Sequence, residues 1–154
     1  MKLQKLLSLV RQAVERYGMI ETGDRIAVGV SGGKDSLTLL MALKKLSEFY
    51  PEPFEVCGIL VDLGYENTDS EEVRRFCEAL PVEFSVIHTQ IGQIVLEERK
   101  EKNPCALCAK MRKGALVQEA LRMGCNKIAY AHHKDDFVET MLLSLIFQGQ
   151  FYAF

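Results

Sequence analysis

Positions 25–36 read Arg25-Ile26-Ala27-Val28-Gly29-Val30-Ser31-Gly32-Gly33-Lys34-Asp35-Ser36. The first half is an apolar run with β-branched residues, which predicts a short buried strand over 25–30. The second half is a polar turn with two adjacent glycines, and leucines at helical spacing follow it over 37–49. A strand, a glycine turn and a helix are therefore expected to follow one another directly.

The rest of the chain repeats this alternation. Apolar residues at three- and four-residue spacing predict a helix over 3–17, which Gly18 ends. Further strands are expected at 54–61, 82–88 and 127–130, and further helices at 69–80, 107–123 and 135–147. The charged stretch 91–104 has no clear periodicity.

Alternating strands and helices predict an α/β fold, in which an open parallel sheet has helices on both faces and a helix precedes it. Ligands of such sheets bind at the carboxyl ends of the strands. Segments 31–36, 62–68 and 131–136 are expected at that edge, so their side chains are the first candidates for a site.

The composition fits one domain over 1–154, with a helix at 1–20 and a core at 24–154. Hydrophobic residues make up 48% and charged residues 26%, and the net charge is −2. No apolar run is long enough to cross a bilayer and no signal-peptide core is present, so a cytoplasmic protein without membrane contact is expected.

The five cysteines are an odd number, which argues against a disulfide framework. The apolar end, 147–154, indicates a chain truncated at its C-terminus.

The turn 31–36 has the features of a phosphate-binding loop. Gly32 and Gly33 allow the backbone to approach an anion closely, and the helix start at Ser36 supplies free N–H groups and a positive dipole end. The hydroxyls of Ser31 and Ser36 and the charge of Lys34 add donors. The alternative is a tight turn with capping serines. Neither the Walker pattern nor G-x-G-x-x-G is present.

Carboxylates lie at two other strand ends. Asp62 ends the second strand, where it could contact a ribose or a metal, or cap a turn. The segment Ala131-His132-His133-Lys134-Asp135-Asp136 follows the fourth strand. Its oxygens suit Mg²⁺ near phosphates and its histidines can donate to phosphoryl oxygens, although aspartates at a helix start also cap the helix.

Cys105 and Cys108 stand three residues apart at the start of a helix. Such a pair can direct two sulfurs at one centre, and the helix dipole with nearby cations lowers thiol pKa values, which suits a soft metal or an iron–sulfur cluster. Two small buried residues, a redox pair and half of a zinc site remain alternatives.

A local concentration of cations surrounds this pair. Over 99–113 there are six cations against one acid, namely Arg99, Lys100, Lys102, Lys110, Arg112 and Lys113 against Glu101. RNA phosphates attract such patches, and a solvated helix face is the alternative.

Ser31-Gly32-Gly33-Lys34-Asp35-Ser36 resembles the signature of the PP-loop ATP pyrophosphatases, and the segment 132–140 resembles the His-His-x-Asp-Asp-x-x-Glu-Thr motif of their tRNA 2-thiocytidine synthetase branch. That branch also carries Pro-Cys-x-x-Cys before a basic helix, as at 104–108. Its members often have glycine where this chain has Ala131. The resemblance implies a Rossmann-type fold of the adenine nucleotide α-hydrolase kind over nearly the whole chain.

The resemblance also implies a reaction. ATP would adenylate the C2 oxygen of a tRNA cytidine, pyrophosphate would leave, and sulfur would then displace AMP. The loop 31–36 would hold pyrophosphate, Leu60 or Val61 would contact adenine, and Asp62 would lie near the ribose. The expected catalytic residues are Asp35, His132, which would polarise a phosphate, and Asp136, which with Asp35 would hold Mg²⁺.

Cys105 and Cys108 would ligate a [4Fe-4S] cluster whose third cysteine is not in this chain. The implied partners are tRNA and a sulfur donor such as a cysteine desulfurase or sulfide, and a homodimer stays open. Two other functions also stay open. One is another PP-loop adenylating ligase of the amidotransferase-synthetase type, and the other is a nucleotide-binding module without turnover.

Overall fold

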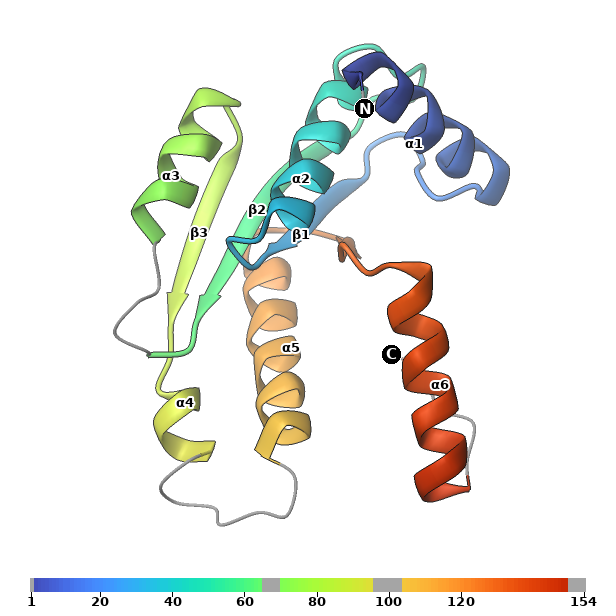
Figure 1. The fold of residues 1–154 in the computed structure, drawn as a ribbon. Coiled ribbons are helices and arrows are strands. Elements are labelled where there is room, and N and C mark those ends of the chain that lie inside the picture. Colours follow the sequence, from blue (N-terminus) through green and yellow to red (C-terminus); the bar gives the residue numbers. More distant parts are fainter. Residues whose placement is uncertain (1, 65–69, 96–103, 150–154) are drawn as a thin grey trace.

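The computed structural model describes residues 2–64, 70–95 and 104–149 (Figure 1). The elements follow the expected alternation: α1 (Leu3–Tyr17), β1 (Arg25–Val30), α2 (Lys34–Ser47), β2 (Glu55–Asp62), α3 (Ser70–Ala79), β3 (Glu83–His88), α4 (Ile91–Gln93), α5 (Pro104–Arg122), β4 (Lys127–Ala129) and α6 (Lys134–Gln148). Gly18 ends α1 in the left-handed region, with φ 55°, as expected of a glycine after a helix.

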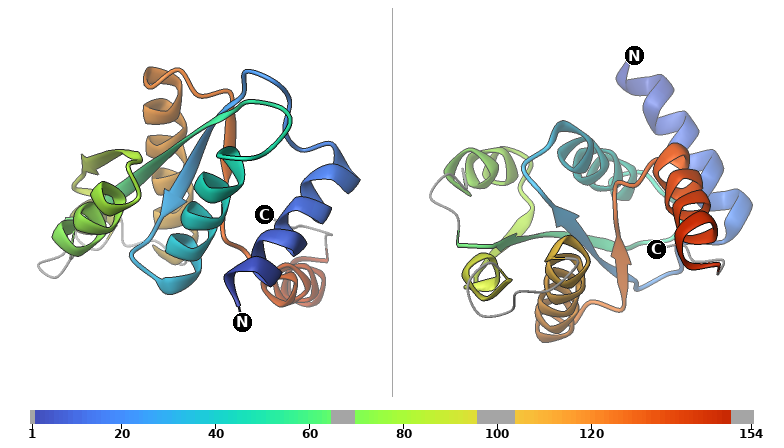
Figure 2. Two further views of the ribbon diagram at one scale, coloured as in Figure 1. Left: turned by 90° about the horizontal axis from the view of Figure 1, so that it is seen from above. Right: turned by 60° about the horizontal axis from the view of Figure 1, so that its bottom comes forward.

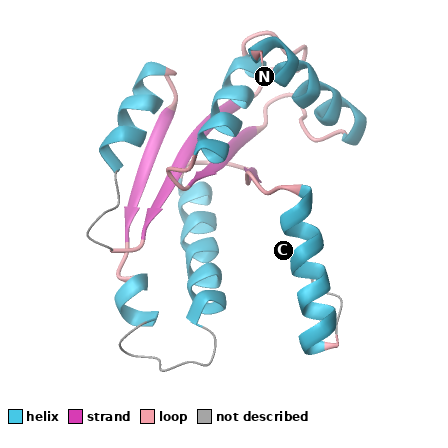
Figure 3. Ribbon diagram, viewed as in Figure 1, coloured by secondary structure: helices cyan, strands magenta, loops and turns pink. Residues whose placement is uncertain are grey.

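The strands form one parallel sheet in the order β3-β2-β1-β4 (Figure 3). Helices lie on both faces of the sheet (Figure 2). One hydrophobic core contains side chains of α1, α2 and α3, and a second core on the other face contains side chains of α4 and α5. Because both faces are covered, β2 is buried along almost its whole length. The predicted fold class is therefore confirmed.

The last helix, α6, lies beside the sheet rather than on it (Figures 1 and 2). Its apolar side chains remain largely exposed, among them Leu142, Leu143 and Ile146. No helix among the described residues is long and apolar enough to cross a membrane.

Two helices begin three residues earlier than their apolar periodicity predicted. α2 starts at Lys34 instead of 37, with Gly33 in extended conformation as its N-cap. α5 starts at Pro104, before its apolar periodicity begins at 107, which agrees with the expected position of Cys105 and Cys108 at a helix start. Proline is favourable at the first helical position, where its missing N–H is no loss. Periodicity misses the first turn of α2 because Lys34, Asp35 and Ser36 are polar. In the stretch 91–104, α4 is a short helix, and 96–103 lie outside the described residues.

The amino-terminal edge of the sheet is held by polar contacts around Asp24. This buried carboxylate accepts hydrogen bonds from the Glu21 N–H and the Asn126 side chain, both at 2.7 Å, and its other contact is Lys127 Nζ at 2.6 Å. The hydrogen bond from Lys127 is the largest cause that lowers the pKa of Asp24 to about 2. The link before β1 is thereby fixed to the start of β4.

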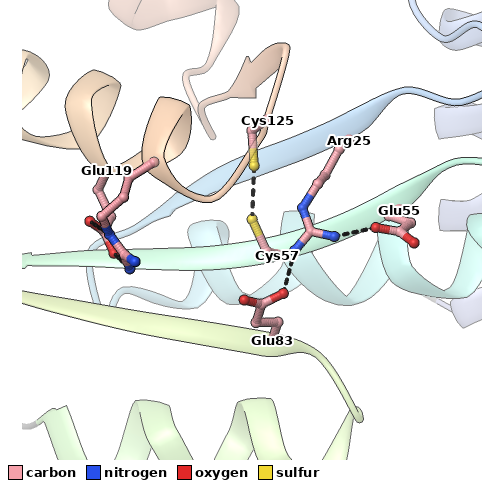
Figure 4. Close-up of polar contacts among 7 residues, drawn as sticks. Arg25, Glu55, Cys57, Glu83, Glu119 and Cys125 are labelled. Atoms are coloured by element: carbon pink, nitrogen blue, oxygen red, sulfur yellow. Dashed lines mark hydrogen bonds and ion pairs between the residues drawn. The ribbon is translucent and has the colours of Figure 1, made fainter.

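At the same edge Arg25 of β1 reaches Glu55 on β2 and Glu83 on β3 (Figure 4). The sulfurs of Cys57 and Cys125 point toward each other, 3.3 Å apart and buried (Figure 4). Burial, reinforced by the neighbouring thiol, raises the pKa of Cys57 to about 12. Cys125 lies away from the carboxyl edge, because its neighbour Cys57 stands near the start of β2.

Candidate nucleotide-binding cleft

A cleft of about 290 Å³ opens at the carboxyl edge of the sheet. Its walls come from β1 and the following turn, the end of β2, the middle of α5, and the link between β4 and α6. The lining residues are Gly29, Val30, Ser31, Gly33, Asp35, Ser36, Val61, Arg112, Leu116, Tyr130, Ala131 and His132. The tertiary structure thus brings together segments that are about a hundred residues apart.

The glycine turn is ordered by its own hydroxyls. The Ser36 hydroxyl donates to Gly33 O at 2.9 Å and accepts the Ser31 N–H at 3.1 Å. Gly32 has φ 79°, a conformation that a side chain would strain. The turn therefore has one defined shape before any ligand binds.

This turn presents a helix N-terminus. The first backbone hydrogen bond of α2 runs from the Leu37 N–H to Gly33 O at 3.2 Å, so the N–H groups of residues 34–36 precede the helical ladder. Free N–H groups and the positive end of the helix dipole favour an anion. Lys34 is exposed on the same turn but does not line the cleft.

The two adjacent histidines face different partners. The His132 ring lines the cleft and stacks on Tyr130, with ring centroids 5.5 Å apart and planes 10° apart. His133 Nε2 lies 3.2 Å from Asp35 Oδ2, and this contact is the main cause that raises the pKa of His133. The backbone at His133 is extended, with φ −93° and ψ 157°. Consecutive side chains of an extended backbone point to opposite sides, which explains why the two histidines have different partners.

Asp136 lies in the first turn of α6 and does not line the cleft. Its Oδ2 accepts the His133 N–H at 2.9 Å, so the capping role weighed from the sequence is present. The described residues include no group of three or more histidine, cysteine or acidic side chains that could hold a metal by themselves. A Mg²⁺ ion here would need phosphate oxygens or water as further ligands.

Asp62 likewise takes the capping role. Its side chain accepts the Gly64 N–H at 2.9 Å and lies 3.1 Å from His88 Nδ1. Of the strand-end residues expected near the nucleotide, Val61 lines the cleft. Leu60 is buried, and neither it nor Asp62 lines the cleft. Gly32 is also outside the lining.

The cysteine pair lies at the start of α5. Cys108 is half-buried and, like Leu107 and Met111, packs against the hydrophobic core on this face of the sheet. The side chain of Cys105 lies outside the described part of the structure, as do Arg99, Lys100 and Lys102. Arg112, one turn after Cys108, is exposed and lines the cleft. α5 therefore connects the cysteine pair to the cleft.

Sequence reasoning did not assign Tyr130 or Arg112 to the site. Tyr130 directly follows β4, so its position after a strand was an available signal. Arg112 was placed only in the basic patch, although its four-residue spacing from Cys108 puts both on one helix face. Ala131 was noted as a departure, but among described non-glycine residues only Pro81 has a positive φ, so a side chain fits there.

A family model described as a PP-loop domain matches residues 3–153. The chain belongs to the PP-loop family. It is 40% identical over 97% of its length to a tRNA-cytidine(32) 2-sulfurtransferase of Pelobacter propionicus, and 38% identical over 96% to one of Geobacter sulfurreducens. The chain spans 56% and 58% of these two relatives. The family resemblance stated from the motifs is confirmed.

Solved structures agree with this PP-loop fold. A U34-tRNA thiolase from Methanococcus maripaludis, NcsA with its [4Fe-4S] cluster, superposes with a TM-score of 0.78 at 22% identity and covers 96% of this chain and 50% of its own. The NH3-dependent NAD synthetase of Campylobacter jejuni superposes with a TM-score of 0.62 at 20% identity, and the match covers 92% of this chain and 60% of the synthetase chain. At these identities the likeness concerns the fold alone.

Proposed function

We propose that this PP-loop domain binds ATP and catalyses the adenylation step of a tRNA sulfurtransferase that acts on a cytidine. The observation that carries the proposal is the cleft, in which a glycine turn, a helix N-terminus and His132 converge. The tRNA-cytidine sulfurtransferase relatives indicate the substrate class.

In this proposal the turn 31–36 holds the β- and γ-phosphates, which leave as pyrophosphate. The N–H groups of 34–36 and the charge of Lys34 stabilise the negative charge that develops there. Val61 and the backbone at Leu60 contact adenine. Asp62 reaches the ribose only if its present contacts with the Gly64 N–H and His88 are released.

The chemistry has two displacements. The C2 oxygen of cytidine attacks the α-phosphorus, and the bond to the oxygen bridging to the β-phosphate breaks. A sulfur nucleophile then attacks C2, and AMP leaves with the original oxygen. His132 lies where its ring can donate to a phosphoryl oxygen, and Arg112 adds a positive charge within the same cleft.

A divalent cation fits beside Asp35 and Asp136. Each carboxylate uses one oxygen toward His133, and the other forms no hydrogen bond with the residues that the structure describes. Two carboxylate oxygens completed by phosphate and water suit Mg²⁺. When bound, the ion would supply charge neutralisation at the phosphates.

An iron–sulfur cluster would be held by Cys105 and Cys108. The second of these is half-buried one turn from the cleft, which fits a cluster close to the reacting base. Among the described cysteines, Cys57 and Cys125 lie at the opposite edge and Cys77 lies on the buried face of α3, so the third ligand would come from outside them. Such a cluster would supply a carrier for sulfur, whose donor would be a desulfurase or sulfide.

tRNA would approach along α5. Lys110, Arg112 and Lys113 are exposed on this helix next to the cleft, and they form the described part of the basic patch. Cations beside a reactive site attract the phosphates of RNA and orient the substrate.

The test measures pyrophosphate release and 2-thiocytidine formation by the full chain, prepared without oxygen, with unmodified tRNA and ATP. Asp35→Asn is expected to lower pyrophosphate release about tenfold or more, whereas Asp135→Asn, an exposed neighbour of Asp136, leaves it within about twofold. Cys108→Ala is expected to abolish thiolation while pyrophosphate release continues.

Two outcomes contradict the proposal. If no pyrophosphate is released with any tRNA, the domain is not an adenylating one. If Cys108→Ala leaves thiolation unchanged, the cysteine pair has no part in sulfur transfer, and an adenylating ligase of another type becomes the better explanation.

A further inference from the structure

His133 contacts both carboxylates that the proposed function assigns to the divalent cation. Its ring Nε2 lies 3.2 Å from Asp35 Oδ2, and its backbone N–H donates to Asp136 Oδ2 at 2.9 Å. Asp35 belongs to the first turn of α2 and Asp136 to the first turn of α6. One residue therefore links two acidic groups that come from distant parts of the chain.

The ring contact is not part of a packed core. The side chains of His133 and Asp35 are 62% and 52% exposed, and exposed ion pairs contribute little to folding stability. What the contact does determine is geometry, because it restrains the rotamer of Asp35. The capping hydrogen bond restrains Asp136 in the same way.

Both restraints leave an oxygen available. Asp35 Oδ1 and Asp136 Oδ1 make no hydrogen bond within the described ranges of the chain. Mg²⁺ requires nearly ideal octahedral geometry, so the orientation of its carboxylate ligands affects affinity directly. Hydrogen bonds that orient metal ligands are worth about 10–100-fold in metal affinity.

We propose that His133 is a positioning residue that sets the orientation of Asp35 and Asp136 for the divalent cation bound with the nucleotide. The inference rests on the proposed function, since it takes the nucleotide and its cation to bind in this cleft. The neighbouring His132 has a different role, because its ring lines the cleft and stacks on Tyr130.

The test compares His133→Ala with His133→Gln in the full chain. Glutamine can place its amide N–H near the position of Nε2, and both variants keep the backbone N–H that Asp136 accepts. Lys134→Ala is the matched control, because Lys134 is the next residue, is exposed and has no hydrogen bond or ion pair with a described residue. The probe is Mn²⁺ in the presence of α,β-methylene-ATP, followed by electron paramagnetic resonance without turnover.

We expect His133→Ala to weaken Mn²⁺ binding about tenfold, and His133→Gln and Lys134→Ala to stay within about threefold of the wild type. Binding of α,β-methylene-ATP in EDTA is expected to be unchanged in all three. In pyrophosphate release, the alanine variant should need about tenfold more Mg²⁺ for half-maximal rate and should approach the wild-type rate at saturation.

The outcomes separate the two proposals. If the wild type binds the nucleotide and Mn²⁺ and His133→Ala binds Mn²⁺ equally well, the positioning role is refuted while the proposed function stands. If His133→Gln binds Mn²⁺ as weakly as His133→Ala, a hydrogen-bond donor at the position of Nε2 does not account for the affinity. That result also refutes the positioning role. A wild type that binds neither the nucleotide nor Mn²⁺ overturns both proposals.

Discussion

Replacing Asp24 with asparagine tests how the amino-terminal edge of the sheet is held together. Asparagine keeps one oxygen, which can accept from Glu21 or from Asn126 but not from both, because these two donors bind different oxygens of Asp24. The substitution also removes the negative charge opposite Lys127. Asp24 is only 4% exposed, so water replaces little of the lost interaction. The effect should therefore approach the full value of the charge.

The magnitude follows from the pKa. In the folded protein the pKa of Asp24 falls from its ordinary value of 3.8 to about 2, with Lys127 as the first cause. Since each pKa unit corresponds to about 1.4 kcal/mol, the carboxylate contributes about 2 kcal/mol to the free energy of unfolding at pH 7. The lowered pKa means that this stability is present above pH 4 and is lost as the pH falls toward 2.

The assay is urea denaturation of the wild type and Asp24→Asn at pH 7 and pH 3. The variant should be less stable by about 2 kcal/mol at pH 7 and by about 1 kcal/mol at pH 3. Glu48→Gln removes an acid paired with Lys45 on the surface of α2, and it should leave the midpoint unchanged. A difference that is absent at pH 7, or equally large at both pH values, would refute the reasoning.

Three further substitutions or reactions test local features. Gly32→Ala should cost about 1 kcal/mol of unfolding free energy in urea denaturation, because φ is 79° there. A variant as stable as the wild type would contradict the strain. Gly29→Ala should lower the free energy of unfolding by about 1–3 kcal/mol, because the added carbon would lie 2.9 Å from Leu116 Cδ1. A melting temperature equal to that of the wild type would show that Leu116 can move to accommodate the methyl group. Cys57 should resist iodoacetamide at pH 8 in the native state, since burial raises its pKa to about 12. It should react once urea unfolds the chain. If mass spectrometry finds Cys57 alkylated without urea, the thiol is accessible in the native protein and the reasoning is wrong.

Much of the fold could be read from the chain because its signals are local. Apolar periodicity located every helix and strand apart from α4, and β1 was predicted with its observed bounds, Arg25–Val30. The errors lie at helix starts such as Lys34, where the first turn is polar and its residues also suit a loop. The candidate site was predicted where it consists of one continuous segment, as in the turn 31–36.

Other site features depend on residues that are remote in sequence. Nothing near Asp35 indicates that its partner is His133, almost a hundred residues later. Nothing near Asp62 indicates that His88 lies beside it, because that contact requires the parallel register of β2 and β3. These contacts follow from the order of strands in the sheet, which no local pattern contains.

The amino-acid sequence by itself determined the alternation of strands and helices, the glycine turn that ends β1, and the cysteine pair at the start of α5. These depend on spacing and turn chemistry within a few residues. Only the tertiary structure decided that Arg112 and Tyr130 line the cleft, that Asp35 meets His133 and that Asp62 meets His88. The reason is physical: a side chain's partners across the sheet are set by strand order and register, and these emerge only when both faces of the sheet are packed.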